Sequence, residues 1–198
     1  MGPRIGVFGA GAIGGFLGVH LAAGGADVTL LGRRSLLEHA GRLRARRVDG
    51  ARVEPGASLR LTDDPEQLRD RELVLVTVKS GDTEAACTQL AALTRRDCVL
   101  VSLQNGLDNS ATLRARLGDR VVGGIVSYNV IREDGGACLR QTTGGSILAG
   151  RGAGEVAAAM RTLARALDVA GLTLELRDDI DAFNARLFDE VNNGVYKC

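Results

Sequence analysis

The chain has 198 residues, of which 45% are hydrophobic and 25% are charged, and its formal net charge is +1. This length suits one domain, or one domain with part of another. Proteins that bind nucleic acid or anionic membranes usually carry a large excess of positive charge, and this chain does not. No uninterrupted apolar run reaches the roughly 18 residues of a membrane span. The four cysteines form no C-x-x-C pair, which argues against a metal site or redox dithiol, and we expect a cytoplasmic protein with reduced thiols.

The N-terminal segment carries a glycine pattern typical of dinucleotide binding. A short apolar run at residues 5–8 leads into G-x-G-x-x-G at Gly9, Gly11 and Gly14. Gly9 allows a sharp strand-to-helix turn, Gly11 lets the backbone approach a pyrophosphate, and Gly14 lets the helix lie close to the sheet. The alternative is a tight turn that serves packing only.

The phosphate would lie at the N-terminus of the helix that we expect over residues 12–23. Unpaired N–H groups and the positive end of the helix dipole stabilise negative charge there. The cofactor-binding residues predicted in this segment are Gly9, Gly11, Ala12, Ile13 and Gly14.

Strand-like and helix-like segments alternate along the rest of the chain. Residues 35–47 are compatible with a helix, residues 48–62 with short strands, and the glycine-rich residues 138–150 with an antiparallel pair. Further strands are expected at residues 27–31, 72–78, 98–103, 121–130 and 172–176, and further helices at residues 82–93, 113–117 and 154–170. This alternation predicts an α/β, Rossmann-like, doubly wound and mostly parallel sheet with helices on both faces.

Four segments together resemble the ketopantoate reductase (2-dehydropantoate 2-reductase) family. They are the glycine loop, Leu31-Gly32-Arg33, Val78-Lys79 and the Leu-Gln-Asn-Gly-Leu sequence of residues 103–107. The resemblance implies an oxidoreductase of pantothenate biosynthesis that uses NADP(H) to reduce a small 2-keto acid, 2-dehydropantoate, to pantoate. It also implies a dinucleotide-binding domain over residues 1–177 and the start of an interdomain helix over residues 178–198. From the resemblance we expect the family's C-terminal helical domain to be largely absent from this chain.

The residues after the second strand favour NADP over NAD. An NAD site normally has a carboxylate about 20 residues beyond the glycines, which binds the ribose hydroxyls. Arg33 and Arg34 stand there instead, and a guanidinium can pair with the 2′-phosphate of NADP. Arg33 is the preferred contact. The alternative is a solvated basic face, since further arginines follow within residues 42–47.

Lys79 and Asn105 follow two predicted neighbouring strands. The carboxyl ends of parallel strands form the edge at which open α/β sheets bind ligands. We therefore expect Lys79 to contact the cofactor and Asn105 to hydrogen-bond both cofactor and a substrate oxygen. The alternatives are a surface lysine and an Asn-Gly turn.

The sequence departs from the family at the proton donor. The resemblance places the family's catalytic lysine at Leu187, so this lysine is missing, and Arg186 beside it is the weak candidate for stabilising an alkoxide. Three hypotheses remain: a reductase, a truncated or non-catalytic NADP-binding module, and a reductase completed by a second copy or a partner chain.

Overall fold

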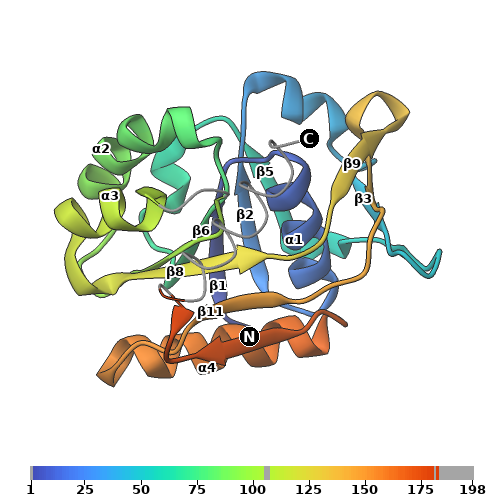
Figure 1. The fold of residues 1–198 in the computed structure, drawn as a ribbon. Helices are drawn as coiled ribbons and strands as arrows, with labels where there is room; N and C mark the ends of the chain where they lie inside the picture. The colour runs from blue at the N-terminus through green and yellow to red at the C-terminus, as the bar shows by residue number, and fades with distance from the viewer. Residues whose placement is uncertain (1, 105–107, 181, 183–198) are drawn as a thin grey trace, which may run out of the picture.

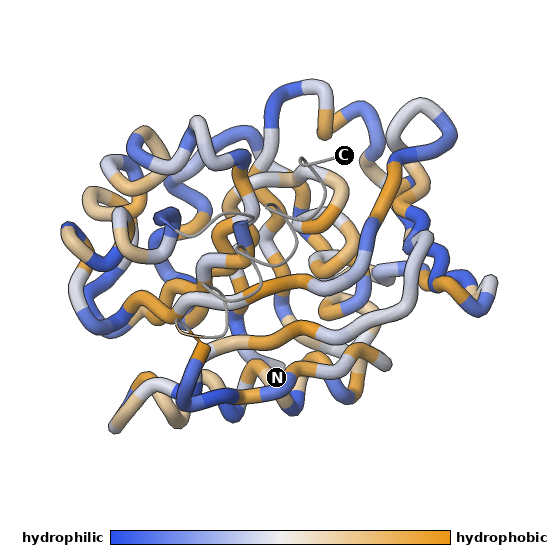
Figure 2. The backbone as a smooth tube through the Cα atoms, viewed as in Figure 1, coloured by the Kyte–Doolittle hydropathy of each residue, from blue (hydrophilic) through white to orange (hydrophobic). Residues whose placement is uncertain are grey.

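The computed structural model describes residues 2–104, 108–180 and 182. These residues form two β-sheets and four α-helices (Figure 1). The strands of the larger sheet carry mostly hydrophobic residues, whereas hydrophilic residues gather in the peripheral loops (Figure 2). Within the described residues, no helix combines the length and the apolar character needed to cross a bilayer.

The larger sheet has eight strands in the spatial order β12-β11-β8-β7-β6-β1-β2-β5. Their bounds are β1 Arg4–Phe8, β2 Asp27–Leu31, β5 Leu59–Thr62, β6 Leu73–Val76, β7 Val99–Ser102, β8 Val121–Val126, β11 Ile147–Gly150 and β12 Leu174–Arg177. The six strands from β5 to β8 are parallel, and β11 joins β8 in antiparallel fashion. The predicted doubly wound, mostly parallel sheet is thus confirmed.

The strand order places a topological switch point between β1 and β6. From β1 the chain proceeds outward through β2 to β5, and then returns to the other side of β1 to form β6, β7 and β8. The order β5-β2-β1-β6-β7-β8 is the arrangement of dinucleotide-binding sheets, which bind their ligand outside the carboxyl ends of the strands at this switch.

Helices cover both faces of the larger sheet. Their bounds are α1 Ala12–Ala23, α2 Thr83–Leu93, α3 Asp108–Leu117 and α4 Gly154–Val169. Residues of α1 and α4 share one hydrophobic core with alternate strand residues such as Ile5 and Val7. Residues of α2 and α3 share a second core on the opposite face with Phe8, Val74 and Val76. Short 3-10 helices are η1 Arg34–His39, η2 Gly56–Ser58, η3 Pro65–Leu68, η4 Ser80–Asp82, η5 Gly118–Arg120 and η6 Asp134–Gly136.

A second sheet of four strands packs against the outer side of α1. Its order is β4-β3-β10-β9, with bounds β3 Arg44–Arg46, β4 Arg52–Val53, β9 Val130–Glu133 and β10 Cys138–Gln141. Ala45 and Leu139 point inward and are buried in the same core as α1. Because this sheet covers α1 from outside, residues 14–22 of the helix are all buried.

The second sheet corrects two sequence-based expectations. Residues 35–47 are not one helix, because the chain leaves η1 and enters β3. Residues 138–150 do not form an antiparallel pair with each other, since β10 pairs with β9 in the small sheet and β11 pairs with β8 in the large one. The backbone partners of these segments are distant in sequence, so local patterns did not identify them.

Candidate functional site

A cavity of about 800 Å³ opens at the carboxyl ends of β1, β2 and β6. Its walls include the glycine turn after β1, Arg33 after β2 and Lys79 after β6. These three predicted site regions are far apart in sequence, and the strand order brings them to the topological switch point. The cavity therefore lies where a dinucleotide fits this fold.

The glycine turn leaves no room for side chains on its inner side. Gly9 has a φ of +116°, a conformation that L-residues rarely adopt. A Cβ at Gly14 would lie 2.1 Å from the Gly9 carbonyl oxygen and 2.3 Å from Thr77 Oγ1. The first turn of α1 can consequently pack directly on the turn that precedes it.

The outer side of the same turn is open. Gly11 is the N-cap of α1, and the nearest atom to a Cβ placed there is the Thr77 carbonyl oxygen at 4.0 Å. The first turn of α1 holds no acidic residue, and its first N–H groups have no partner within the helix. An open approach, N–H donors that have no partner within the helix, and the positive end of the helix dipole together fit a bound pyrophosphate.

The other two predicted residues of α1 take different places. Ala12 lines the cavity. Ile13 is half-buried and packs against the hydrophobic core of the α1 side. Its side chain thus serves packing, and its predicted contribution to a phosphate site is limited to the backbone N–H.

Arg33 and Arg34 are separated by the start of η1. Arg33 is the N-cap residue of η1 and lines the cavity, whereas Arg34 is exposed and does not line it. Within the described part of the chain, the structure gives Arg33 no ion pair. Its charge is therefore available to a ligand at this edge.

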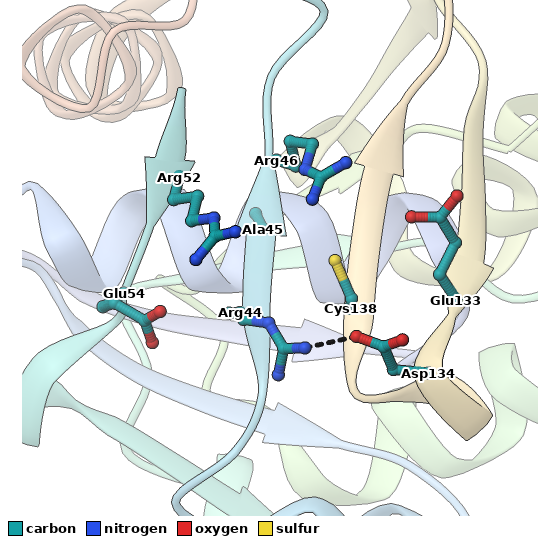
Figure 3. Close-up of a pocket in the computed structure, with 8 residues that line it drawn as sticks. All are labelled: Arg44, Ala45, Arg46, Arg52, Glu54, Glu133, Asp134 and Cys138. Atoms are coloured by element: carbon teal, nitrogen blue, oxygen red, sulfur yellow. Dashed lines mark hydrogen bonds and ion pairs between the residues drawn. The ribbon is translucent and has the colours of Figure 1, made fainter. Parts of the chain in front are cut away.

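The arginines that follow face another way. Arg44, Arg46 and Arg52 line a separate cavity of about 410 Å³ on the outer face of the small sheet (Figure 3). Arg44 is ion-paired there with Asp134. The basic residues after β2 are accordingly not one continuous solvated face, and Arg33 differs from them in its position at the larger cavity.

A buried polar network anchors the backbone of Val78, the residue before Lys79. The side-chain amide of Gln104 donates to the carbonyl oxygen of Val78 at 3.2 Å and to Thr83 Oγ1 at 2.8 Å. The Ser102 hydroxyl donates to Gln104 Oε1 at 3.2 Å. This network ties Ser102 and Gln104, at the end of β7, to Val78 and Thr83 in the segment after β6.

Two predicted functional residues lie outside the described residues. Asn105 follows Gln104 directly, and Arg186 lies in the C-terminal segment together with Leu187. Their assignments stay predictions.

Sequence reasoning missed three residues that shape this site. Thr77 donates its hydroxyl to the Gly9 carbonyl oxygen at 2.7 Å, Gln104 organises the buried network, and Arg132 donates to the Ala10 carbonyl oxygen. A signal existed for two of them, because Thr77 and Gln104 are polar residues that directly follow apolar strand sequences. The sequence held no comparable signal for Arg132, because this residue belongs to the small sheet, which local patterns did not reveal.

Comparison with known proteins agrees with this geometry. The family model of the ketopantoate reductase PanE/ApbA matches residues 5–154, more than half of the chain. The chain belongs to the ketopantoate reductase family. The family resemblance drawn from the sequence is thereby confirmed.

Curated relatives carry the same family name. The 2-dehydropantoate 2-reductase of Halobacterium salinarum is 36% identical over 179 residues, which cover 85% of this chain and 56% of the relative. That of Archaeoglobus fulgidus is 32% identical over 180 residues, covering 90% and 57%. The chain thus spans somewhat more than half the length of these relatives.

A solved structure supports the fold. The PanE/ApbA family ketopantoate reductase from Ralstonia eutropha superposes with a TM-score of 0.79 at 26% identity, covering 94% of this chain and 60% of the other. The Rossmann-like architecture described above is shared with that ketopantoate reductase.

Proposed function

We propose that this chain is the coenzyme-binding part of an NADPH-dependent 2-dehydropantoate 2-reductase. The observation that carries the proposal is the convergence of the glycine turn, Arg33 and Lys79 on one cavity of about 800 Å³ at the switch point of the sheet. A nicotinamide dinucleotide fits such a site, and the curated relatives are named for this reaction.

Arg33 supports NADP as the coenzyme. A carboxylate at this strand end would accept hydrogen bonds from the ribose hydroxyls of NAD and repel a 2′-phosphate. A guanidinium instead offers bidentate N–H donors to a phosphate. Because Arg33 forms no ion pair with a described residue, its guanidinium can pair with the 2′-phosphate without first breaking one.

The reaction adds a hydride to the ketone carbon and a proton taken from water to its oxygen, which converts the keto acid to a hydroxy acid. The nicotinamide, when bound, supplies the hydride. We assign Asn105 to hold the carbonyl oxygen, because in the sequence it stands three residues after the last residue of β7, and parallel sheets bind ligands at the carboxyl ends of their strands. Arg186 is assigned to stabilise the developing negative charge, although arginine is a poor proton donor at neutral pH.

A second function is favoured by Leu187. The family resemblance places the catalytic lysine at this position, where leucine can neither donate a proton nor stabilise an alkoxide. The alternative is therefore an NADP-binding module that lacks turnover, or one that needs a further chain to complete the reaction.

Coenzyme titration tests both proposals. NADPH and NADH are titrated separately while nicotinamide fluorescence is followed, and 2-dehydropantoate is then added while absorbance of the reduced nicotinamide is recorded. Tighter binding of NADPH with oxidation on adding the keto acid supports the reductase. Tighter binding of NADPH without oxidation supports the binding module. Absence of binding to both coenzymes would refute both.

A further inference from the structure

The small sheet directs one arginine toward the cavity of about 800 Å³ at the switch point, which we call the coenzyme cavity. Arg132 of β9 lies opposite Leu139 of β10, and residues paired in this way on antiparallel strands share a face. Leu139 is fully buried, and its Cδ1 lies 2.7 Å from the position of a Cβ at Gly15 in α1. The shared face is thus the one that covers α1, and Arg132 projects from it beside the start of that helix.

The guanidinium of Arg132 reaches the glycine turn. Its Nη2 donates to the carbonyl oxygen of Ala10, and its side chain lines the cavity of about 800 Å³. Ala10 lies two residues before Ala12, the first residue of α1. A guanidinium has five N–H donors, so a single bond to a carbonyl leaves donors for a second acceptor at this turn.

The acidic residues next to Arg132 in sequence are engaged elsewhere. Glu133 accepts from Arg140 at 2.7 Å, and Asp134 is ion-paired with Arg44. Glu133 and Asp134 both line the cavity on the outer face of the small sheet (Figure 3). Neither carboxylate neutralises Arg132, which projects from the opposite face.

The acidic residues of the coenzyme cavity do not neutralise Arg132 either. Asp63 and Asp82 line this cavity. Among the residues that the structure describes, no carboxylate forms an ion pair with Arg132. Its positive charge therefore lies beside the N-terminus of α1, and no described residue provides an anionic partner for it.

We propose that Arg132 binds the pyrophosphate of the coenzyme, so that the small sheet contributes to the nucleotide site. This inference rests on the proposed function. The dipole of α1 offers about half a positive charge at its N-terminus, whereas a pyrophosphate carries two negative charges. Arg132 supplies a full positive charge at that position. Arg33 then serves the 2′-phosphate, which only NADP(H) carries.

The two arginines can be distinguished by comparing coenzymes. NADPH and NADH share the pyrophosphate and differ in the 2′-phosphate. Loss of Arg132 therefore weakens both coenzymes by the same factor, and loss of Arg33 weakens NADPH alone. A charge-assisted hydrogen bond of ordinary strength corresponds to a loss of about tenfold or more in affinity.

The experiment measures dissociation constants of NADPH and NADH for the unchanged chain and for Arg132→Ala, Arg132→Lys and Arg33→Ala. Arg46→Ala is the matched control, because it removes an arginine from the outer face of the same sheet (Figure 3). Each titration is repeated at low and high salt, and a urea unfolding curve for each variant verifies that it is folded.

We expect Arg132→Ala to weaken both coenzymes about tenfold and to reduce the salt dependence of binding, with Arg132→Lys recovering part of each. Arg46→Ala should bind like the unchanged chain. Unchanged affinity in Arg132→Ala, a loss confined to NADPH, or an unchanged salt dependence would overturn the assignment while leaving the proposed function intact. Failure of the unchanged chain to bind either coenzyme would overturn both.

Discussion

The hydroxyl of Thr77 donates a hydrogen bond of 2.7 Å to the carbonyl oxygen of Gly9. This bond joins the end of β6 to the turn after β1, across the switch point of the sheet. The same hydroxyl lies 2.3 Å from the position that a Cβ at Gly14 would take. Thr77 therefore fills the space that Gly14 leaves and fixes the turn against the neighbouring strand.

Gly14→Ala should destabilise the fold and impair coenzyme binding. Its Cβ would meet the Gly9 carbonyl oxygen at 2.1 Å, so α1 must shift away from the turn. Such overpacking costs about 1–3 kcal/mol. Urea unfolding and NADPH titration measure the two effects.

Gly18→Ala is the matched control in the same helix. The nearest atom to its Cβ is Leu30 Cδ1 at 3.5 Å, an ordinary contact. Alanine is favoured over glycine in a helix interior by roughly 0.5–1 kcal/mol, so this variant should be as stable as the original or more so. Equal losses in the two variants would show that close packing at Gly14 is not the cause.

Gln104→Leu should unfold at lower urea concentration. The side chain is buried, and its loss leaves the Val78 carbonyl and the Ser102 hydroxyl without this partner. An unsatisfied buried polar group costs about 1–3 kcal/mol. The exposed Gln67→Leu serves as control and should stay within about 0.5 kcal/mol of the original. A Gln104 variant as stable as this control would contradict the structural role given to the network.

Arg33→Asp should reverse the coenzyme preference. A carboxylate at this strand end repels the 2′-phosphate of NADPH and can accept hydrogen bonds from the ribose hydroxyls of NADH. We expect NADPH affinity to fall about tenfold or more while NADH affinity is kept. Parallel titrations of both coenzymes measure this. Arg34→Asp, outside the cavity, should leave the preference nearly unchanged, and a larger effect from Arg34 would reassign the contact.

His20 should make the fold less stable in mild acid. Its ring is fully buried and its Nδ1 lies 3.0 Å from the carbonyl oxygen of Ala170. Burial lowers the pKa of His20 below the usual 6.5 of histidine, and the hydrogen bond to Ala170 only partly opposes this. The unfolded chain therefore takes up a proton at higher pH than the folded chain does.

The contribution of neutral His20 to the free energy of unfolding is therefore complete above about pH 6.5. It is lost as the pH falls toward the lowered pKa of His20. The loss is at most about 1.4 kcal/mol per pH unit. His20→Asn keeps a donor near Ala170 but does not titrate, so its free energy of unfolding should change less between about pH 7 and about pH 5.5. A slope that survives His20→Asn would assign the effect to other groups.

The sequence predicted the larger sheet well, because its strands are continuous apolar runs separated by turn residues and helix starts. The run at residues 73–76, for example, is buried on both faces, as a central parallel strand requires. The glycine turn was equally predictable, since each glycine meets a distinct local steric demand. Arg33 and Lys79 followed from their positions at strand ends.

The small sheet could not be predicted in the same way. Its strands are two to four residues long, and β3 carries three residues that read Arg-Ala-Arg, with only the central alanine buried. Such short segments have no periodicity of their own, and their pairing depends on partners that are distant in the chain. Arg132 was missed for this reason, although it contacts the same turn that the glycines identified.

The small sheet also affects the order in which the domain can assemble. Arg44 of β3 pairs with Cys138 of β10, so the cover over α1 is completed only after more than ninety further residues have been synthesised. Until then the outer side of a helix that is almost entirely buried in the finished fold remains exposed to water. Contacts of such long sequence separation slow folding, and they leave intermediates whose exposed hydrophobic surface makes them prone to aggregate. A ribosome-bound chain that ends before β10 should therefore be a preferred client of chaperones, and one that extends beyond it should not.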